Sequence, residues 1–280
     1  MTQAARDQFT RMFAPDGTVL LHPDRPQAKY RPLRAVRNFQ ILMKDKEDTV
    51  AVFKIFESLP SKDFLPRIAQ LALSGKGEEL RRTEAWLPEI LDDHAALRRT
   101  PKGSLAHAYC DFMEAEGLSA AGLVAESERS GRPRFPDLVE WYINRSRDTH
   151  DMFHILTGYG RDALGEASVL LFTHGQQPSQ GHLLIGYAGA ANIKKMAKGT
   201  KAPVFGAVRE AHRTGKGAPQ LIAQPIRELL ARPLAEVRAE MRIPEPEQYR
   251  ECHRIWQAEG IDPHNLLASR KPVEPELLAA

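Results

Sequence analysis

Four potential metal ligands lie within seventeen residues near the middle of the chain, namely His150, Asp151, His154 and Glu166. An α-helix advances 100° per residue, so the two histidines lie about 40° apart and Asp151 about 100° from His150, on one shared face. A Gly-Tyr-Gly sequence at 158–160 then favours the end of this helix and a reversal of the chain. Two imidazoles and two carboxylates in this arrangement predict a divalent metal site.

Glu166 lies beyond that reversal, in a second helix that begins near residues 161–162. Measured from the turn along antiparallel axes, His154 lies about 6 Å and Glu166 about 9 Å away. The two side chains therefore reach one cavity, and the site is expected between two adjacent helices. His174 and His182 lie farther along the chain and are left out of it.

The ligand types favour zinc, iron(II), manganese or cobalt over magnesium and calcium, which prefer all-oxygen shells. If one carboxylate stays unligated, the two histidines and the other carboxylate form the facial triad of a non-haem iron site. If all four bind, a closed tetrahedral zinc site results. Asp151 is thus either a fourth ligand or a general base.

The alternative is an ordinary polar helix face with solvated carboxylates. The flanking residues argue against it, because residues 152–156 and 167–172 are mostly apolar. Histidines and carboxylates within such helices are costly to bury unless they are paired or bound to metal.

The elements that would position this site are helices, because apolar residues recur at three- and four-residue spacing through most of the chain. The expected helices cover residues 34–58, 64–73, 77–90, 104–115, 136–156, 161–172, 183–197, 204–212, 223–231, 233–241 and 247–256. Strand-like alternation is scarce. We therefore predict an all-α fold with one multi-helix domain at 34–256, an N-terminal extension at 1–33 and a C-terminal tail at 257–280.

Composition excludes several classes of protein. A net charge of +3 with 27% charged residues gives no general basic field, so nucleic acid is not an expected partner. Cys110 and Cys252 lack CxxC spacing, which argues against a disulfide framework, an iron–sulfur site or a cysteine zinc site.

The longest apolar stretch, 183–193, is too short to span a bilayer. Residues 1–13 lack the apolar core of a secretory signal, so a cytoplasmic protein, soluble or peripheral, is expected.

A basic cluster follows the apolar segment, formed by Lys194, Lys195, Lys198 and Lys201. It is either a solvated helix end or a binding surface for anionic lipid headgroups.

Three segments resemble one known family. Residues 147–158 with Gly165-Glu166 resemble the HDxxH-x11-E signature of the coenzyme Q biosynthesis protein 4 family. Residues 100–113 look like a second family segment, with Ser104 in place of a threonine, and residues 233–244 are similar to the family's closing helix. The resemblance spans roughly 35–250. The acidic, tryptophan-containing run that the family often carries before its closing helix is replaced here by residues 224–230.

This resemblance implies a role in ubiquinone biosynthesis on a polyprenylated aromatic ring. The implied reaction is an oxidative decarboxylation that replaces the carboxylate at ring carbon one with a hydroxyl. Residues 183–193 would shelter the isoprenoid tail. The resemblance also implies contact with other ubiquinone biosynthesis proteins, a homo-oligomer and, for a bacterial-type chain, a peripheral place at the inner membrane.

Two alternatives remain open from the sequence. The first alternative to the decarboxylase is a non-catalytic, lipid-binding scaffold that organises the biosynthetic complex around a structural metal. The second is a metal-dependent hydrolase. An open coordination position facing an apolar channel favours catalysis, whereas a closed four-ligand site favours structure. A hydrolase would need further His or Asp ligands upstream, and the candidates that lie close together there are Asp92, Asp93 and His94.

Overall fold

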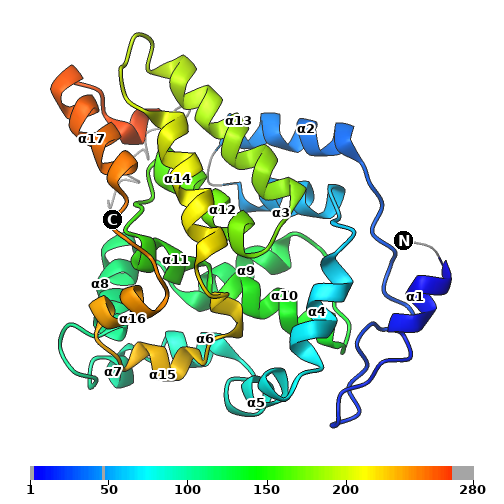
Figure 1. The fold of residues 1–280 in the computed structure, drawn as a ribbon. Coiled ribbons are helices and arrows are strands. Elements are labelled where there is room, and N and C mark those ends of the chain that lie inside the picture. The colour runs from blue at the N-terminus through cyan, green and yellow to red at the C-terminus, as the bar shows by residue number, and fades with distance from the viewer. Residues whose placement is uncertain (1–2, 46–47, 267–280) are drawn as a thin grey trace, which may run out of the picture.

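The computed structural model describes residues 3–45 and 48–266, and within them the regular secondary structure is helical apart from isolated bridges (Figure 1). The helices are α1 Gln3–Phe9, α2 Pro32–Leu42, α3 Thr49–Ser58, α4 Phe64–Ala72, α5 Gly75–Thr83, α6 Leu87–Leu91, α7 His94–Leu97, α8 Leu105–Glu116, α9 Ala120–Arg129, α10 Leu138–Asp148, α11 His150–Thr157, α12 Ala163–Gln176, α13 Gln180–Met196, α14 Val204–Gly217, α15 Ile226–Leu230, α16 Leu234–Glu240 and α17 Glu247–Glu259, with 3-10 turns at Leu221–Ala223 and Pro263–Asn265. The described residues contain no strand beyond two isolated bridges. The all-α prediction is confirmed.

Helix α12 occupies the centre of the molecule and packs against α11, α13 and α14 (Figure 1). Most of α12 is buried, including Leu164, Val169 and Phe172. Its backbone packs directly against that of α14, where a Cβ added to Gly215 would lie 2.1 Å from the carbonyl oxygen of Phe172. The packing of α12 therefore fixes the direction in which the side chains of its first turn point.

The helix expected over 136–156 is two helices, α10 and α11, separated at Thr149. Thr149 has φ −89° and ψ 1°, and its hydroxyl donates a hydrogen bond to the backbone carbonyl of Arg145 at 2.9 Å. Such local side-chain bonding competes with helix continuation. The break starts a new helix axis at His150, directly before the predicted ligands.

Two other expected helices are also divided. The segment 34–58 forms α2 and α3, and Asp48 caps α3 by accepting a hydrogen bond from the Ala51 amide at 2.9 Å. The segment 77–90 forms α5 and α6. The short helices α1, α7 and α9 were not expected, and most of the expected tail, 267–280, lies outside the described residues.

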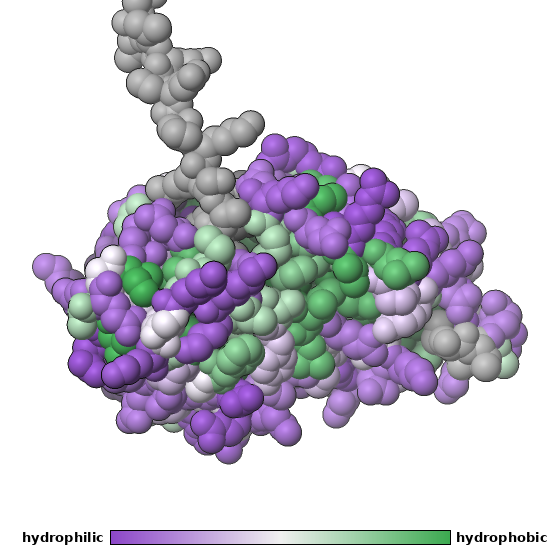
Figure 2. Space-filling model, turned by 90° about the horizontal axis from the view of Figure 1, so that it is seen from above, coloured by the Kyte–Doolittle hydropathy of each residue, from purple (hydrophilic) through white to green (hydrophobic). Residues whose placement is uncertain are grey.

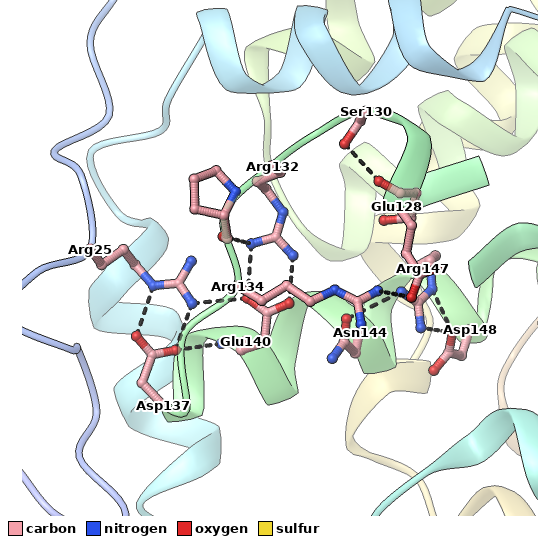
Figure 3. A network of polar contacts seen from close by, with 12 residues as sticks. Arg25, Glu128, Ser130, Arg132, Arg134, Asp137, Glu140, Asn144, Arg147 and Asp148 are labelled. Atoms are coloured by element: carbon pink, nitrogen blue, oxygen red, sulfur yellow. Dashed lines mark hydrogen bonds and ion pairs between the residues drawn. The ribbon is translucent and has the colours of Figure 1, made fainter. Parts of the chain in front are cut away.

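A network of ion pairs ties the N-terminal segment and the loop before α10 to that helix (Figure 3). Arg25 donates to Asp137 at 2.7 Å and to Glu140 at 2.9 Å, and Arg132 donates to Glu140 at 2.6 Å. These carboxylates are largely buried, and the two arginines hold the pKa of Glu140 below its usual value despite its burial. The start of α10 is thereby held in place from two sides.

Candidate metal centre

Three of the four predicted ligands converge where α11 and α12 meet. One ligand atom each from His150, His154 and Glu166 lies within 4.8 Å of the other two. The imidazole Nε2 of His154 is 3.6 Å from a carboxylate oxygen of Glu166, and the two histidine rings are 5.3 Å apart between centroids. Two nitrogens and one carboxylate oxygen at this separation match the donor set of a borderline divalent ion.

The turn between the two helices is fixed by several contacts. Gly158 ends α11 with φ +74°, a conformation that glycine adopts without steric cost. Asp162 then caps α12 by accepting hydrogen bonds from the Leu164 and Gly165 amides at 3.0 and 3.2 Å. The hydroxyl of Tyr249 accepts from the Gly160 amide and donates to Asp162. Glu166 follows in the first turn of α12, at a defined height beside α11.

The ring of His154 is held in one orientation by a backbone contact. Its Nδ1 lies 3.1 Å from the carbonyl oxygen of Tyr159, which accepts the ring proton and leaves the Nε2 lone pair free to bind a metal. Phe112 of α8 stacks on the ring at a centroid distance of 5.6 Å. Burial lowers the pKa of both His150 and His154, an effect that the charge of Asp151 partly offsets. Both rings are therefore neutral near pH 7, as ligands must be.

Asp151 is outside this three-residue cluster. It lines the same cavity as the ligands, and its carboxylate interacts electrostatically with both histidines and with the phenol of Tyr109. Asp151 lies about 100° around α11 from His150, farther round the helix than His154 at about 40°, and its carboxylate is not among the three ligand atoms that converge. Its role as a fourth ligand or a general base stays a prediction.

The two other segments that carry the family resemblance both support α11. Ser104 caps α8, accepting a hydrogen bond from the His107 amide at 3.3 Å, and α8 packs on α11. From α16, Arg238 donates to the backbone carbonyl of Ile155 at 2.8 Å, close to the end of α11. The three segments thus build one structural unit around the cluster.

An apolar cavity of about 790 Å³ opens beside the cluster. Apolar side chains from several helices line it, including Val52, Phe53 and Phe56 of α3, Leu170 of α12 and Ile185 of α13. The expected shelter at 183–193 contributes only Ile185 and Gly189, whereas α3 was not singled out by sequence reasoning. The α3 sequence, with six apolar residues in ten, was the available signal.

A second cluster is formed by His94, Cys110 and Glu114. Glu114 is already hydrogen-bonded there, to the His94 ring at 2.9 Å and to Arg98 at 2.7 Å, closer than the 3.6 and 3.7 Å that separate Glu166 from His154 and Arg161. The carboxylate of Asp92 next to His94 caps α9 by accepting the amides of residues 120 and 121. These pairings remove the support for a hydrolase built on this region.

None of the described helices has the length and apolar character needed to cross a membrane.

Comparisons with known proteins agree on one family. The model of the family described as Coenzyme Q (ubiquinone) biosynthesis protein Coq4 matches residues 77–247. The mitochondrial ubiquinone biosynthesis protein COQ4 of Arthroderma otae is 30% identical over 159 residues, covering 55% of this chain and 55% of that protein. Its namesake from Podospora anserina is 26% identical over 211 residues, covering 74% and 66%.

A solved structure shares the fold. The crystal structure of a proposed ubiquinone biosynthesis protein from Nostoc punctiforme aligns with a TM-score of 0.52 at 20% identity, covering 76% of this chain and 98% of that one. The chain spans between 44% and 66% of the length of the curated relatives it matches.

Proposed function

Because the chain belongs to the Coenzyme Q (ubiquinone) biosynthesis protein Coq4 family, we propose that it acts in ubiquinone biosynthesis as a metal-dependent oxidative decarboxylase of a polyprenylated hydroxybenzoate. The observation that carries the proposal is that the three candidate metal ligands, His150, His154 and Glu166, line the apolar cavity. Such a cavity can hold an isoprenoid tail while the polar ring lies at the cluster.

The proposed ligands are His150, His154 and Glu166, with Asp151 as the general base. The match to the HDxxH-x11-E signature and the convergence of the three side chains support this assignment. When bound, a divalent ion would supply a Lewis acid that polarises the ring carboxylate or phenolate and activates an oxygen-containing co-reactant. Zinc, iron(II), manganese and cobalt all suit this donor set.

The residues around the cluster have separate roles in this proposal. The walls of α3 and α13 bind the tail and exclude water. Arg161 lines the cavity 3.7 Å from Glu166, and its charge attracts an anionic ring substituent. Asp151, which lines the same cavity, accepts the proton of the attacking oxygen. Replacing the carboxylate by hydroxyl releases CO₂ and, with water as the oxygen source, removes two electrons from the ring, so the reaction needs an oxidant as co-reactant.

The proposal is tested with a prenylated 4-hydroxybenzoate labelled with ¹³C in its carboxylate. We expect release of ¹³CO₂ together with a product that carries a new ring hydroxyl, detected by mass spectrometry. His154→Ala should abolish both, whereas His94→Ala, in the second cluster, should leave them unchanged. Tight binding of the substrate without ¹³CO₂ release in the presence of dioxygen and each candidate metal would instead favour the non-catalytic lipid-binding scaffold.

The exposed face of α2 supports a peripheral contact with a membrane. Leu33, Val36 and Ile41 are 85%, 46% and 41% exposed, and arginines at 34 and 37 lie on the same helix. Figure 2 shows hydrophobic side chains gathered in a band on the side of the molecule that carries α2 and α13, with hydrophilic side chains around it. An apolar stripe with basic neighbours is typical of a helix lying in a lipid interface.

The lysine cluster at the end of α13 offers fewer free charges to lipid headgroups than the sequence suggests, because Lys194 donates to the backbone carbonyl of Thr200 at 2.8 Å. We therefore assign the primary membrane contact to α2. Leu33→Glu should weaken co-sedimentation with vesicles containing anionic lipid, and Lys194→Ala should have little effect. The reverse ranking would contradict the assignment.

Contacts with other ubiquinone biosynthesis proteins, a homo-oligomer and an inner-membrane location are proposed from family membership alone. The domain limits 34–256 stay a prediction from the helical pattern of the sequence.

A further inference from the structure

Helix α9 forms one wall of the cavity but contributes little to the hydrophobic core. It packs against α3 and α10 (Figure 1). The α9 residues that line the cavity recur at three- and four-residue spacing and make up one face of the helix from its N-cap to its C-cap: Ser119, Gly122, Leu123, Glu126, Ser127 and Ser130.

Of the described helices that line the cavity, α9 has the fewest buried residues. Only Ala120 is buried in α9, whereas α4 has two buried residues and α12 has ten. A segment with few buried apolar contacts opens locally at a low free-energy cost. Helix α9 is therefore the wall of this cavity that opens most readily.

The start of α9 is fixed to the neighbouring helices. The carboxylate of Asp92, which directly follows α6, accepts hydrogen bonds from the amides of Ala120 and Ala121 at 2.7 and 2.8 Å. Just before α9, the amide of Leu118 donates to the carbonyl of Met113 in α8 at 2.8 Å, and the Leu118 side chain packs on the core. All these contacts act at one end of the helix, so a rotation about that end leaves them in place.

A side-chain hydrogen bond joins the last turn of α9 to α3. The hydroxyl of Thr49, the first residue of α3, donates to the carboxylate of Glu126 at 2.7 Å, and both residues line the cavity. The Glu126 side chain is 32% exposed, so water can replace the threonine hydroxyl when this bond breaks. After α9, Gly131 has φ +70°, and no atom of the described residues lies within 4 Å of a Cβ added to it. The chain therefore has room to change direction there.

The corner between α8 and α9 lies beside the metal cluster. Glu116, the last residue of α8, pairs with Arg161 at 3.4 Å, and Arg161 lies 3.7 Å from Glu166. Helix α9 begins four residues after Glu116 and is about 14 Å long. Displacement of its last turn thus opens the cavity from the side and leaves the buried helices α11 and α12 where they are.

We propose that α9 is a movable wall through which a prenylated aromatic ring enters and leaves the cavity, with the Asp92 contacts as its pivot and the Thr49–Glu126 hydrogen bond as its latch. The identity of this ligand rests on the proposed function. Opening of such a wall precedes both binding and release. Weakening the latch should therefore raise both rates by the same factor and leave the dissociation constant almost unchanged.

The first test closes the wall covalently. In the variant Thr49→Cys/Glu126→Cys, the two thiols are bridged by a bifunctional methanethiosulfonate with a two-carbon linker, which a reductant removes. Cys110 and Cys252 are fully buried and stay unmodified. The matched control is the same variant treated with methyl methanethiosulfonate, which modifies both thiols without joining them. Intact mass confirms each product, and rapid gel filtration measures the bound fraction of tritium-labelled 3-geranyl-4-hydroxybenzoate.

The order of addition should decide the result. Bridging before the probe is added should lower the bound fraction at least about tenfold relative to the matched control. Bridging after the probe has bound should retain it through gel filtration, and reductant should reverse both effects.

The second test weakens the latch without a cross-link. Thr49→Val should raise the association and release rates by about three- to tenfold, the range expected for one partly exposed hydrogen bond, and change the dissociation constant less than about twofold. Thr173→Val is the matched control, because Thr173 lines the same cavity but its hydroxyl donates to the Val169 carbonyl of its own helix at 2.8 Å. Its rates should equal those of the wild type.

The contrary results are also defined. A bridged protein that binds and releases the probe like its matched control, or unchanged rates in Thr49→Val, overturns the movable wall and leaves the proposed function standing. Thiols that cannot be bridged show that the two side chains do not meet, which overturns the latch. If the wild type does not bind the probe, the prenylated hydroxybenzoate fails as substrate class, and the proposed passage fails with it.

Discussion

Substitution of Gly165 tests whether the packing of the turn positions the metal ligand that follows it. A Cβ at this position would lie 1.9 Å from the carbonyl oxygen of Gly160, whereas real Cβ contacts are not closer than 3.0 Å. In Gly165→Ala the start of α12 must therefore move away from the turn by about 1.1 Å, the difference between these distances. Glu166 is the next residue and moves with it.

The expected effect on metal binding is larger than the effect on folding. Overpacking typically costs about 1–3 kcal/mol, and the gain from alanine in a helix offsets up to about 1 kcal/mol of this. Metal–ligand distances, however, tolerate deviations of only about 0.2 Å. A ligand displaced by about 1 Å should weaken metal binding by at least the roughly 10–100-fold that loss of a supporting contact causes.

Metal affinity is measured by competition with a chromogenic chelator, and the free energy of unfolding is measured by urea denaturation. Gly189→Ala is the matched control, because it lies in α13 on the same cavity and its added Cβ would be 3.9 Å from Ala167, an ordinary contact. We expect Gly189→Ala to bind metal like the wild type. If Gly165→Ala is folded and binds metal as tightly as Gly189→Ala, the turn does not position Glu166 as a ligand.

Three further predictions concern stability. Asp162→Ala, which removes the α12 cap and the buried contact with Tyr249, should lower the free energy of unfolding by about 2–4 kcal/mol in urea titrations, with Asp162→Asn closer to the wild type. Glu84→Ala should cost about 3–5 kcal/mol by the same measurement, because it leaves the buried guanidinium of Arg145 without its ion pair at 2.9 Å; a cost below 1 kcal/mol would contradict this. His182, whose pKa falls to about 3 in the folded protein, makes unfolding easier below pH 6.5, where only the unfolded chain takes up the proton, by up to about 1.4 kcal/mol per pH unit. His182→Leu should flatten that slope between pH 6.5 and 5 in metal-free protein, and an unchanged slope would refute the burial argument.

The helices were predictable from local spacing, whereas their interruptions were not. The apolar period runs through 136–156 without a gap, and the break at Thr149 depends on a hydroxyl that bonds the preceding turn. The break within 34–58 arises at Asp48, whose carboxylate caps α3, and the break within 77–90 arises at Glu84, whose carboxylate accepts the distant Arg227 amide. Local side-chain hydrogen bonds are weak signals against a strong hydrophobic pattern, and a contact across 143 residues leaves no local signal at all.

The candidate site was partly predictable for a comparable reason. His150, His154 and Glu166 are separated by one turn of helix and one chain reversal, so helical geometry places them together. His182 reaches the same cavity through the packing of α13 on α12 and α3, which no local pattern encodes. Separation along the chain therefore predicted which residues lie close together at the α11–α12 turn, but it did not predict that His182 lines the same cavity.

The central claim is that His150, His154 and Glu166 hold a divalent metal ion, and the metal content of the protein tests it most directly. The chain is purified without a metal-affinity step, and bound transition metals are measured by mass spectrometry for the wild type, His154→Ala, Glu166→Ala and His94→Ala. We predict about one metal ion per chain in the wild type and in His94→Ala, and loss of the ion in the other two variants with their helical circular dichroism intact. Metal retained in His154→Ala and Glu166→Ala but lost in His94→Ala, or no metal in the wild type after loading with zinc, iron(II), manganese or cobalt, would contradict the claim.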